Sequence, residues 1–341
     1  MAVSRHVRVL GAALLVALAA QTAQAQPDRT TRGQKTVHCN RVSGPLGTDN
    51  GPGTMRRPFR TAARLIARLR PGQTGCLLGG VYDESLVFDH GGSVGKPVVL
   101  MSFGKSRATI AGFVEVAQSA PYVTLQNFNI DGATTSQQTV QLFAANTVLR
   151  NLDITNQRKG GSCIQIGDFD YGIASRNVID HNWIHDCGLN ASVGGDHGLY
   201  VGTSRGVRIT NNVVFNSAGF GITLYPDAEN TLINGNLVFE SGFASIIFAG
   251  SSDHASSGNV ATRNVLAGVN DGATVTSSWD GPTGGGNLLI DNCIWNNGRP
   301  TIGARDGFTA KSNRTLQPQL ISGPSGPRQT ASSPCRAYGP H

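Results

Sequence analysis

The sequence predicts an all-β chain wound into a parallel β-helix, and three observations carry this prediction: a recurring strand, a recurring asparagine and an amphipathic segment near the start. Gly-Leu-Tyr-Val at 198–201 returns as Gly-Ile-Thr-Leu at 221–224. Each stretch is a short alternating run bounded by turn residues, which is typical of a strand with two side chains on one face. The chain therefore repeats a strand at a spacing too short for a whole domain.

An asparagine precedes an apolar strand seven times along the chain, at Asn127, Asn151, Asn182, Asn212, Asn236, Asn264 and Asn292. The unequal intervals argue against a strict helical repeat, and the richness in Gly, Asn, Val and Ile favours strands. In a parallel β-helix each coil adds short strands to separate sheets, and extra residues loop out at the turns. We expect the seven asparagines to stack as a structural ladder of amide hydrogen bonds.

Residues 54–70 predict a helix that caps the N-terminal end of the β-helix. Its apolar residues recur at helical spacing, at Ala62, Leu65, Ile66 and Leu69, and Pro71 follows. A solenoid needs such a cover because its open end would expose the core. The expected organisation is a lead-in at 26–53, the β-helix with its capping helix at 54–300, and a Gly/Pro/Ser-rich tail at 301–341.

Residues 1–25 have the layout of a secretory signal peptide. Arg5 and Arg8 precede the apolar run at 9–20, and "AQA" ends at Ala25. We expect export to the extracellular space or the periplasm, and no membrane partner once the signal is removed. We also expect a monomer.

Six cysteines follow the predicted signal, and an even number in an exported chain favours disulfides. Their spacing suggests the pairs Cys39 with Cys76, Cys163 with Cys187, and Cys293 with Cys335. No two form a C-x-x-C motif, which argues against zinc.

The formal net charge is +7, which falls to +5 when Arg5 and Arg8 leave with the signal. The sequence has no run of Lys and Arg and no interleaved aromatic stripe, so nucleic acid is not an expected partner. An acidic polysaccharide and an anionic cell surface remain as partners for a basic exported protein, and we expect the acidic polysaccharide.

Several stretches together resemble the right-handed parallel β-helix proteins of the pectin-lyase-like superfamily. The resemblance covers roughly residues 38–300 and rests on the cap segment, on "GGVYDESL" (79–86), on "GKPVVLMSFGKSRATIAG" (95–112) and on the asparagine-bearing coils. It implies a right-handed parallel β-helix. Lyases, hydrolases, epimerases and non-catalytic surface proteins share this scaffold, so the resemblance leaves the reaction open.

A groove is expected over the sheet that carries the repeated strand. If the apolar pairs face inward, Gln165, Tyr200, Thr223 and Ile247 face solvent as one column. Long insertions at 155–162 and 187–197 flank these strands, and long loops are where such scaffolds place binding residues. The expected substrate-binding residues are Gln165, Asp168, Tyr225 and Asp227.

Two motifs in this region are similar to stretches of polygalacturonases. "SCIQIGD" (162–168) and "GDHGLYVGT" (195–203) match Asp-Asp-Cys-x-Ala and Gly-His-Gly-x-Ser-x-Gly, which implies a groove role for His197 and a bridge between Cys163 and Cys187. However, Gly161 and Ser162 stand where that family has its aspartate pair. Since glycoside hydrolysis ordinarily uses two carboxyl groups, we do not expect an ordinary polygalacturonase mechanism.

Lyase chemistry needs a base and a positive charge that stabilises the carbanion-like state. The candidate bases are His197 and Tyr200, and the candidate cations are Arg158, Lys159 and Arg205. Calcium is a candidate cofactor, held by Asp168, Asp196 and Asp227, because this hard ion prefers carboxylate oxygens. We therefore expect a polysaccharide lyase acting on a uronate-containing polymer. The alternatives are a glycoside hydrolase of the polygalacturonase-like type and a non-catalytic glycan-binding solenoid.

Overall fold

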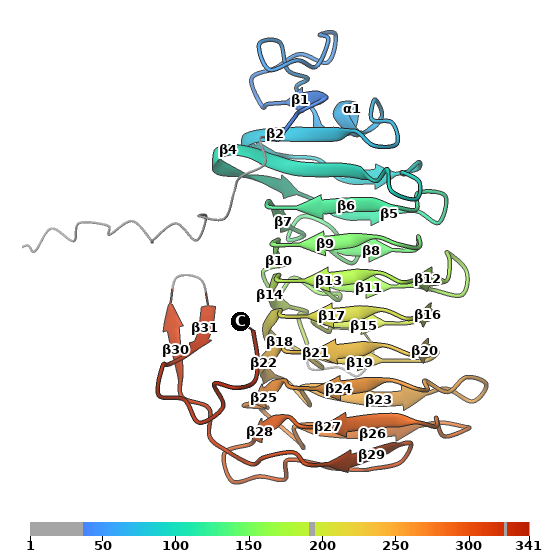
Figure 1. Ribbon diagram of the computed structural model, residues 1–341, viewed down its shortest axis with the longest axis vertical. Coiled ribbons are helices and arrows are strands. Elements are labelled where there is room, and N and C mark those ends of the chain that lie inside the picture. Colours follow the sequence, from blue (N-terminus) through green and yellow to red (C-terminus); the bar gives the residue numbers. More distant parts are fainter. Residues whose placement is uncertain (1–36, 191–194, 324–325, 341) are drawn as a thin grey trace, which may run out of the picture. The chain divides into compact units, whose positions relative to one another are not determined.

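A computed structural model describes residues 37–190, 195–323 and 326–340, and most of their regular structure is parallel β-strand (Figure 1). The predicted signal peptide lies outside the described residues. Within the described ranges, no helix is both long and apolar enough to cross a membrane.

Short strands from successive coils form one parallel sheet, which we call the groove sheet. Its strands are, in order, β3 (Leu86–Phe88), β5 (Val114–Val116), β8 (Val140–Leu142), β11 (Ile164–Ile166), β15 (Leu199–Val201), β19 (Ile222–Leu224), β23 (Ile246–Gly250) and β26 (Val275–Trp279). Leu199 pairs with Ile164 of one neighbouring strand and with Ile222 of the other. This register confirms the repeat seen in the sequence.

A second, larger parallel sheet contains most of the remaining strands. Its strands are β1 (Arg41–Ser43), β2 (Thr74–Tyr82), β4 (Val98–Ala111), β6 (Val123–Gln126), β7 (Asn129–Asp131), β9 (Val148–Arg150), β10 (Asp153–Thr155), β13 (Val178–Asp180), β14 (Trp183–Cys187), β17 (Arg208–Thr210), β18 (Val213–Ser217), β21 (Leu232–Asn234), β22 (Leu237–Ser241), β24 (Val260–Thr262), β25 (Val265–Ala267), β27 (Asn287–Ile290), β28 (Cys293–Trp295) and β29 (Phe308–Lys311). Because β29 pairs with β27, parallel pairing continues past residue 300, where the sequence placed the end of the β-helix.

Two small sheets complete the described strands. The strands β12 (Ala174–Ser175), β16 (Ser204–Arg205) and β20 (Ala228–Glu229) are parallel, and β30 (Leu320–Gly323) and β31 (Gly326–Gln329) are antiparallel.

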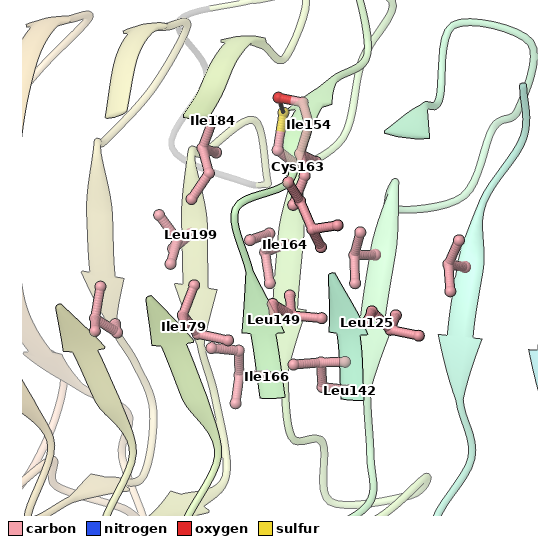
Figure 2. Close-up of a cluster of buried hydrophobic side chains, with 14 of the residues drawn as sticks. Leu125, Leu142, Leu149, Ile154, Cys163, Ile164, Ile166, Ile179, Ile184 and Leu199 are labelled. Atoms are coloured by element: carbon pink, nitrogen blue, oxygen red, sulfur yellow. Dashed lines mark hydrogen bonds between the residues drawn. The ribbon is translucent and has the colours of Figure 1, made fainter. Parts of the chain in front are cut away.

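The core lies inside the coils and consists of stacked aliphatic side chains. Figure 2 shows part of this stack, including Leu149, Ile164 and Ile179, which have no exposed surface. The removal of each such side chain from water contributes roughly 1.5–3 kcal/mol. Every coil therefore adds the same kind of apolar layer to one continuous core.

The asparagine ladder is present, although two of the seven predicted members are not in it. A column of amide hydrogen bonds runs through the buried Asn182, Asn212, Asn236, Asn264 and Asn292 and ends at the partly exposed Asn313. Asn127 and Asn151 lie one residue earlier in their coils, where the backbone φ angles are 63° and 48°. Their side-chain amides bond to each other and not to the column, with Nδ2 of Asn151 donating to Oδ1 of Asn127 at 2.8 Å. The expectation that they stack with Asn182 is therefore wrong.

The capping helix is much shorter than the predicted 54–70. Helix α1 spans Ala62–Ile66, because Thr61 has extended backbone and accepts the N–H of Arg64, as an N-cap does. Glu84 accepts two further N–H groups at the same end, from Ala62 and Ala63. The residues expected to cover the core are nonetheless buried, so the helical spacing identified the right side chains but not the length.

All three predicted disulfides are present: Cys39–Cys76, Cys163–Cys187 and Cys293–Cys335. The last one ties the C-terminal tail to the outer face of the larger sheet, where Cys335 packs with Val213, Leu237 and Val265. The bridge Cys163–Cys187 joins the ends of the two insertions that flank the groove sheet.

Candidate functional site

The outer face of the groove sheet carries the expected column of side chains. Gln165 pairs with Tyr200, Tyr200 with Thr223, and Thr223 with Ile247. Gln141 extends the column on the other side of Gln165. The middle of this face is thus polar and uncharged.

A hollow opens on this face around the centre of the column, and it is lined by Gln138, Ser162, Gln165, Asp168, Gly195 and Tyr200. Three predicted site residues, Gln165, Asp168 and Tyr200, therefore meet in one place. Gln165 donates to Asp168 through Nε2 at 3.2 Å, and this bond orients both side chains.

The sequence reasoning missed Gln138 and Ser162, which form the other side of the hollow. The backbone N–H of Ser162 donates to Oε1 of Gln138, and Oγ of Ser162 donates to the carbonyl of Gly195 at 2.6 Å. The alternation in the sequence could have identified both residues. Val140 and Ile164 are inward-facing partners on adjacent strands, so the residues two positions before them, Gln138 and Ser162, must also be neighbours.

Tyr200 is half-buried on the floor of the hollow. Burial, with the nearby Tyr225 and Asp168, raises the pKa of Tyr200 to about 12. The ring of Tyr225 meets it edge-on at a centroid distance of 6.3 Å, as the expected pairing on adjacent coils requires. At neutral pH Tyr200 is therefore a phenol that can donate a proton, and not a phenolate base.

His197 lies behind Tyr200 instead of on the groove surface. It is 2% exposed, its ring is stacked on Tyr200 at 5.9 Å, and its Nδ1 accepts the backbone N–H of Phe220 at 3.2 Å. Burial lowers the pKa of His197 to about 4, although Asp196 opposes the shift. The neutral ring carries its proton on Nε2, so it is not suited to the role of a base that contacts the substrate.

A pH-dependent stability follows from the buried position of His197. Its folded pKa of about 4 lies below the ordinary value of 6.5. The unfolded chain therefore binds more protons between these values, so the contribution is complete above about pH 6.5 and is lost as the pH falls toward 4. His197→Gln should reduce the drop in unfolding free energy between pH 7.5 and 4.5 by about 2–3 kcal/mol.

Urea unfolding at the two pH values measures this effect, and His38→Gln, at an exposed position, is the control. An unchanged pH dependence in the His197 variant would show that the buried ring is not responsible.

The three predicted cations, Arg158, Lys159 and Arg205, differ in whether their charge is free to bind a substrate carboxylate. Arg205 pairs with Asp227 at 2.8 Å and with Glu229 at 2.9 Å, so it has no free charge to offer a carboxylate. Arg158 donates to Oδ1 of Asn216 at 2.9 Å and lies against the larger sheet. Lys159 is exposed on the insertion 155–162.

Asp196 holds the two insertions together. Its carboxylate accepts backbone N–H groups from Gly161, Leu189 and Asn190 at 2.7–2.9 Å. Burial opposes the charged form, but these hydrogen bonds outweigh it and lower the pKa of Asp196. This carboxylate is therefore a structural tie between the loops that flank the hollow.

The expected calcium ligands do not form one donor set. The carboxylate of Asp196 is engaged by backbone N–H groups, that of Asp227 is paired with Arg205, and Asp168 is held by Gln165. In the part of the chain that the structure describes, no three His, Cys, Asp or Glu side chains gather closely enough to hold a metal ion. The three aspartates thus do not fit a shared calcium site.

Comparison with solved structures identifies the same fold in two lyases and a glycoside hydrolase. The structure is similar to pectate lyase Pel9A, with a TM-score of 0.58, 14% identity and coverage of 88% of this chain and 91% of that one. It is also similar to an alginate lyase from Paenibacillus sp. str. FPU-7, with a TM-score of 0.51, 14% identity and coverage of 75% and 97%. A glycoside hydrolase gives a TM-score of 0.55 at 9% identity, with coverage of 80% and 96%. At such identities the likeness concerns the fold alone.

Sequence comparison gives a short match and a long one. Uncharacterized protein YwoF of Bacillus subtilis (strain 168) is 34% identical over 80 residues, which are 24% of this chain and only 17% of that protein. The match thus spans about a sixth of the length of this curated relative. The family described as right handed beta helix region matches residues 112–283. This match covers half of the chain and includes the strands that carry the hollow, so the chain belongs to the right-handed β-helix family.

Proposed function

We propose that the protein is exported and binds a polysaccharide along the groove sheet. The hollow around Tyr200 lies on an open face lined by amide, hydroxyl and carboxylate groups, which suit sugar hydroxyls. The three disulfides favour an oxidising compartment. The likeness to a pectate lyase and an alginate lyase supports a carbohydrate ligand.

The proposed reaction is β-elimination at a uronate unit, and the protonated, half-buried Tyr200 on the floor of the hollow is the observation that carries it. In this reaction a base removes the proton next to the carboxylate, the bond to the leaving oxygen breaks, and that oxygen takes up a proton. Tyr200 would donate to the leaving oxygen and Asp168 would accept the first proton. The amides of Gln138 and Gln165 would stabilise the charge that develops on the uronate.

The alternative of glycoside hydrolysis receives less support from this geometry. Hydrolysis ordinarily needs a carboxylic acid and a second carboxylate on opposite sides of the bond. Among the described residues that line the hollow, Asp168 is the one carboxylate. For an acidic substrate, the exposed Lys159 and the net charge of +5 that remains without Arg5 and Arg8 supply the attraction.

A non-catalytic glycan-binding solenoid is the second candidate, and one specific observation favours it. Of the described residues that line the hollow, none is a Lys or Arg. A lyase would have to stabilise the uronate anion with neutral donors alone, whereas binding of a glycan needs no such charge.

The proposal is tested by incubating the protein with pectate, alginate or glucuronan and recording ultraviolet absorbance together with reducing ends. We expect both to rise with at least one polymer, because β-elimination leaves an unsaturated uronide at each cut. Reducing ends without absorbance would identify a hydrolase instead. Retardation in gels containing the polymer, without any product, would identify a binding protein.

A further inference from the structure

A tight loop at 167–173 follows the central strand β11 and is held in one conformation by its own hydrogen bonds. The backbones of Asp168 and Gly172 exchange two N–H···O bonds of 3.0 Å, and the N–H of Asp170 donates to Oδ1 of Asp168 at 2.9 Å. Asp168 also lines the hollow. The loop is therefore a fixed edge of the groove, continuous with its floor.

This loop exposes two aromatic rings at its tip. Phe169 is 51% exposed and Tyr171 is 65% exposed. Each ring has one aromatic neighbour: Phe169 lies against His254 at 4.4 Å, and Tyr171 stacks on Phe143 at 5.2 Å. The neighbours fix the rings in place while half or more of each surface stays open to solvent.

The two contacts place the rings along the axis of the groove. Phe143 directly follows β8, the strand before β11, while His254 follows β23, which is three strands beyond β11 in the groove sheet. Since neighbouring strands are about 4.8 Å apart, loop 167–173 and the turn after β23 together reach across the coils between β11 and β23. The rings thus line one side of the column that contains Gln165, Tyr200 and Thr223.

Exposed rings in a fixed arrangement beside a polar hollow are expected to bind something that is both apolar and rich in hydroxyls. The charge of the loop defines this ligand further, because the exposed Asp170 stands between Phe169 and Tyr171, outside the hollow, and the loop contains no Lys or Arg. Carboxylates accept hydrogen bonds from hydroxyls and repel other carboxylates.

We propose that loop 167–173 is an aromatic wall that binds uncharged sugar units of the glycan, with Phe169 and Tyr171 stacked on their C–H faces. This inference rests on the proposed function of the groove and adds the class of substrate to it. A uronate at Tyr200 is flanked by neutral sugars at the wall, so the preferred ligand is a mixed polymer, and polymers of uronates alone bind more weakly.

Affinity electrophoresis tests the wall in gels that contain alginate or pectate, which consist of uronates, or xanthan or hyaluronan, in which uncharged sugars adjoin uronates. We expect the wild-type protein to be retarded most by a mixed polymer. The double variant Phe169→Ala/Tyr171→Ala should bind that polymer at least about tenfold more weakly. Phe169→Tyr and Tyr171→Phe keep the rings and should bind as the wild type does. Val94→Ala removes another exposed apolar side chain and is the matched control.

The charge part of the proposal has its own variant, Asp170→Asn, at an exposed position outside the hollow. It should raise the affinity for alginate relative to the mixed polymer, and no change in this ratio would overturn the assignment of uncharged units. Equal binding by the wild type and the double alanine variant would overturn the aromatic wall alone. A wild-type protein that binds none of the polymers and cleaves none would overturn the proposed function, and the wall with it.

Discussion

Tyr200→Phe is expected to lower the rate of glycan cleavage by about a hundredfold or more, the usual scale for loss of a general acid or base. The variant removes only the hydroxyl. The ring keeps its stacking on His197 at 5.9 Å and its edge contact with Tyr225 at 6.3 Å, so the melting temperature should change little. Initial rates from the absorbance of unsaturated product and a thermal melt, measured on the same preparation, give both quantities.

Tyr122→Phe is the matched control for this experiment, because it removes a tyrosine hydroxyl from a turn before β6 that does not line the hollow. Its rate should equal that of the wild type. Full activity in the Tyr200 variant would move the reacting centre off this face of the groove sheet. A variant that loses the rate and also melts much earlier would instead assign a structural role to the hydroxyl.

The fold could be predicted because each of its requirements leaves a local mark in the sequence. Inward pairs such as Leu199 with Val201 and Ile222 with Leu224 alternate with polar residues, and this period of two survives loops of any length between the coils. The cysteine spacing was equally informative, since all three suggested pairs are bonded. Helix α1 was predicted too long because apolar spacing identifies buried side chains, whereas the N-cap at Thr61 decides where a helix begins.

The candidate site was predicted less completely. The alternation in the sequence shows which side chains form an outward column, but it does not show how deeply a side chain is buried or which charged groups form ion pairs. The alternation placed Gln165 and Tyr200 on the outer face correctly. The burial of His197 depends on Phe220 of the following coil and on the insertions packed around it, which are set by tertiary structure. Arg205 was assigned a free charge because its partners, Asp227 and Glu229, lie more than twenty residues away in the sequence and on the adjacent coil.

The spacing between each asparagine and the next inward apolar residue would have identified the members of the ladder. In the coils that join the ladder, the asparagine stands two residues before an inward apolar residue, as Asn182 does before Ile184 and Asn236 before Val238. Asn151 stands three residues before Ile154, so the ladder position in that coil is Leu152, whose N–H donates to Oδ1 of Asn182 at 2.9 Å. A difference of one residue thus separates a buried amide from an exposed turn residue.

Asn236→Leu should therefore destabilise the protein by about 3–5 kcal/mol, although leucine is similar in size and apolar. Oδ1 of Asn236 accepts both the backbone N–H and the side-chain amide of Asn212, at 2.9 and 3.0 Å, and its Nδ2 donates to the carbonyl of Ile209 at 2.8 Å. Leucine leaves these buried groups without a hydrogen-bond partner, and each unsatisfied group lowers the free energy of unfolding by about 1–3 kcal/mol. The unfolding free energy in urea measures the loss.

Asn151→Gly is the control that separates a ladder asparagine from the other type. Asn151 is exposed with a φ of 48°, a left-handed conformation that glycine adopts without strain, so its replacement should change the unfolding free energy by less than about 1 kcal/mol. A similar loss in both variants would mean that the amide hydrogen bonds of the buried column contribute no more than an exposed turn. A large loss in the Asn236 variant alone would show that the stacked amides hold successive coils in register, including the coils of β15 and β19 that bring Tyr200 against Tyr225.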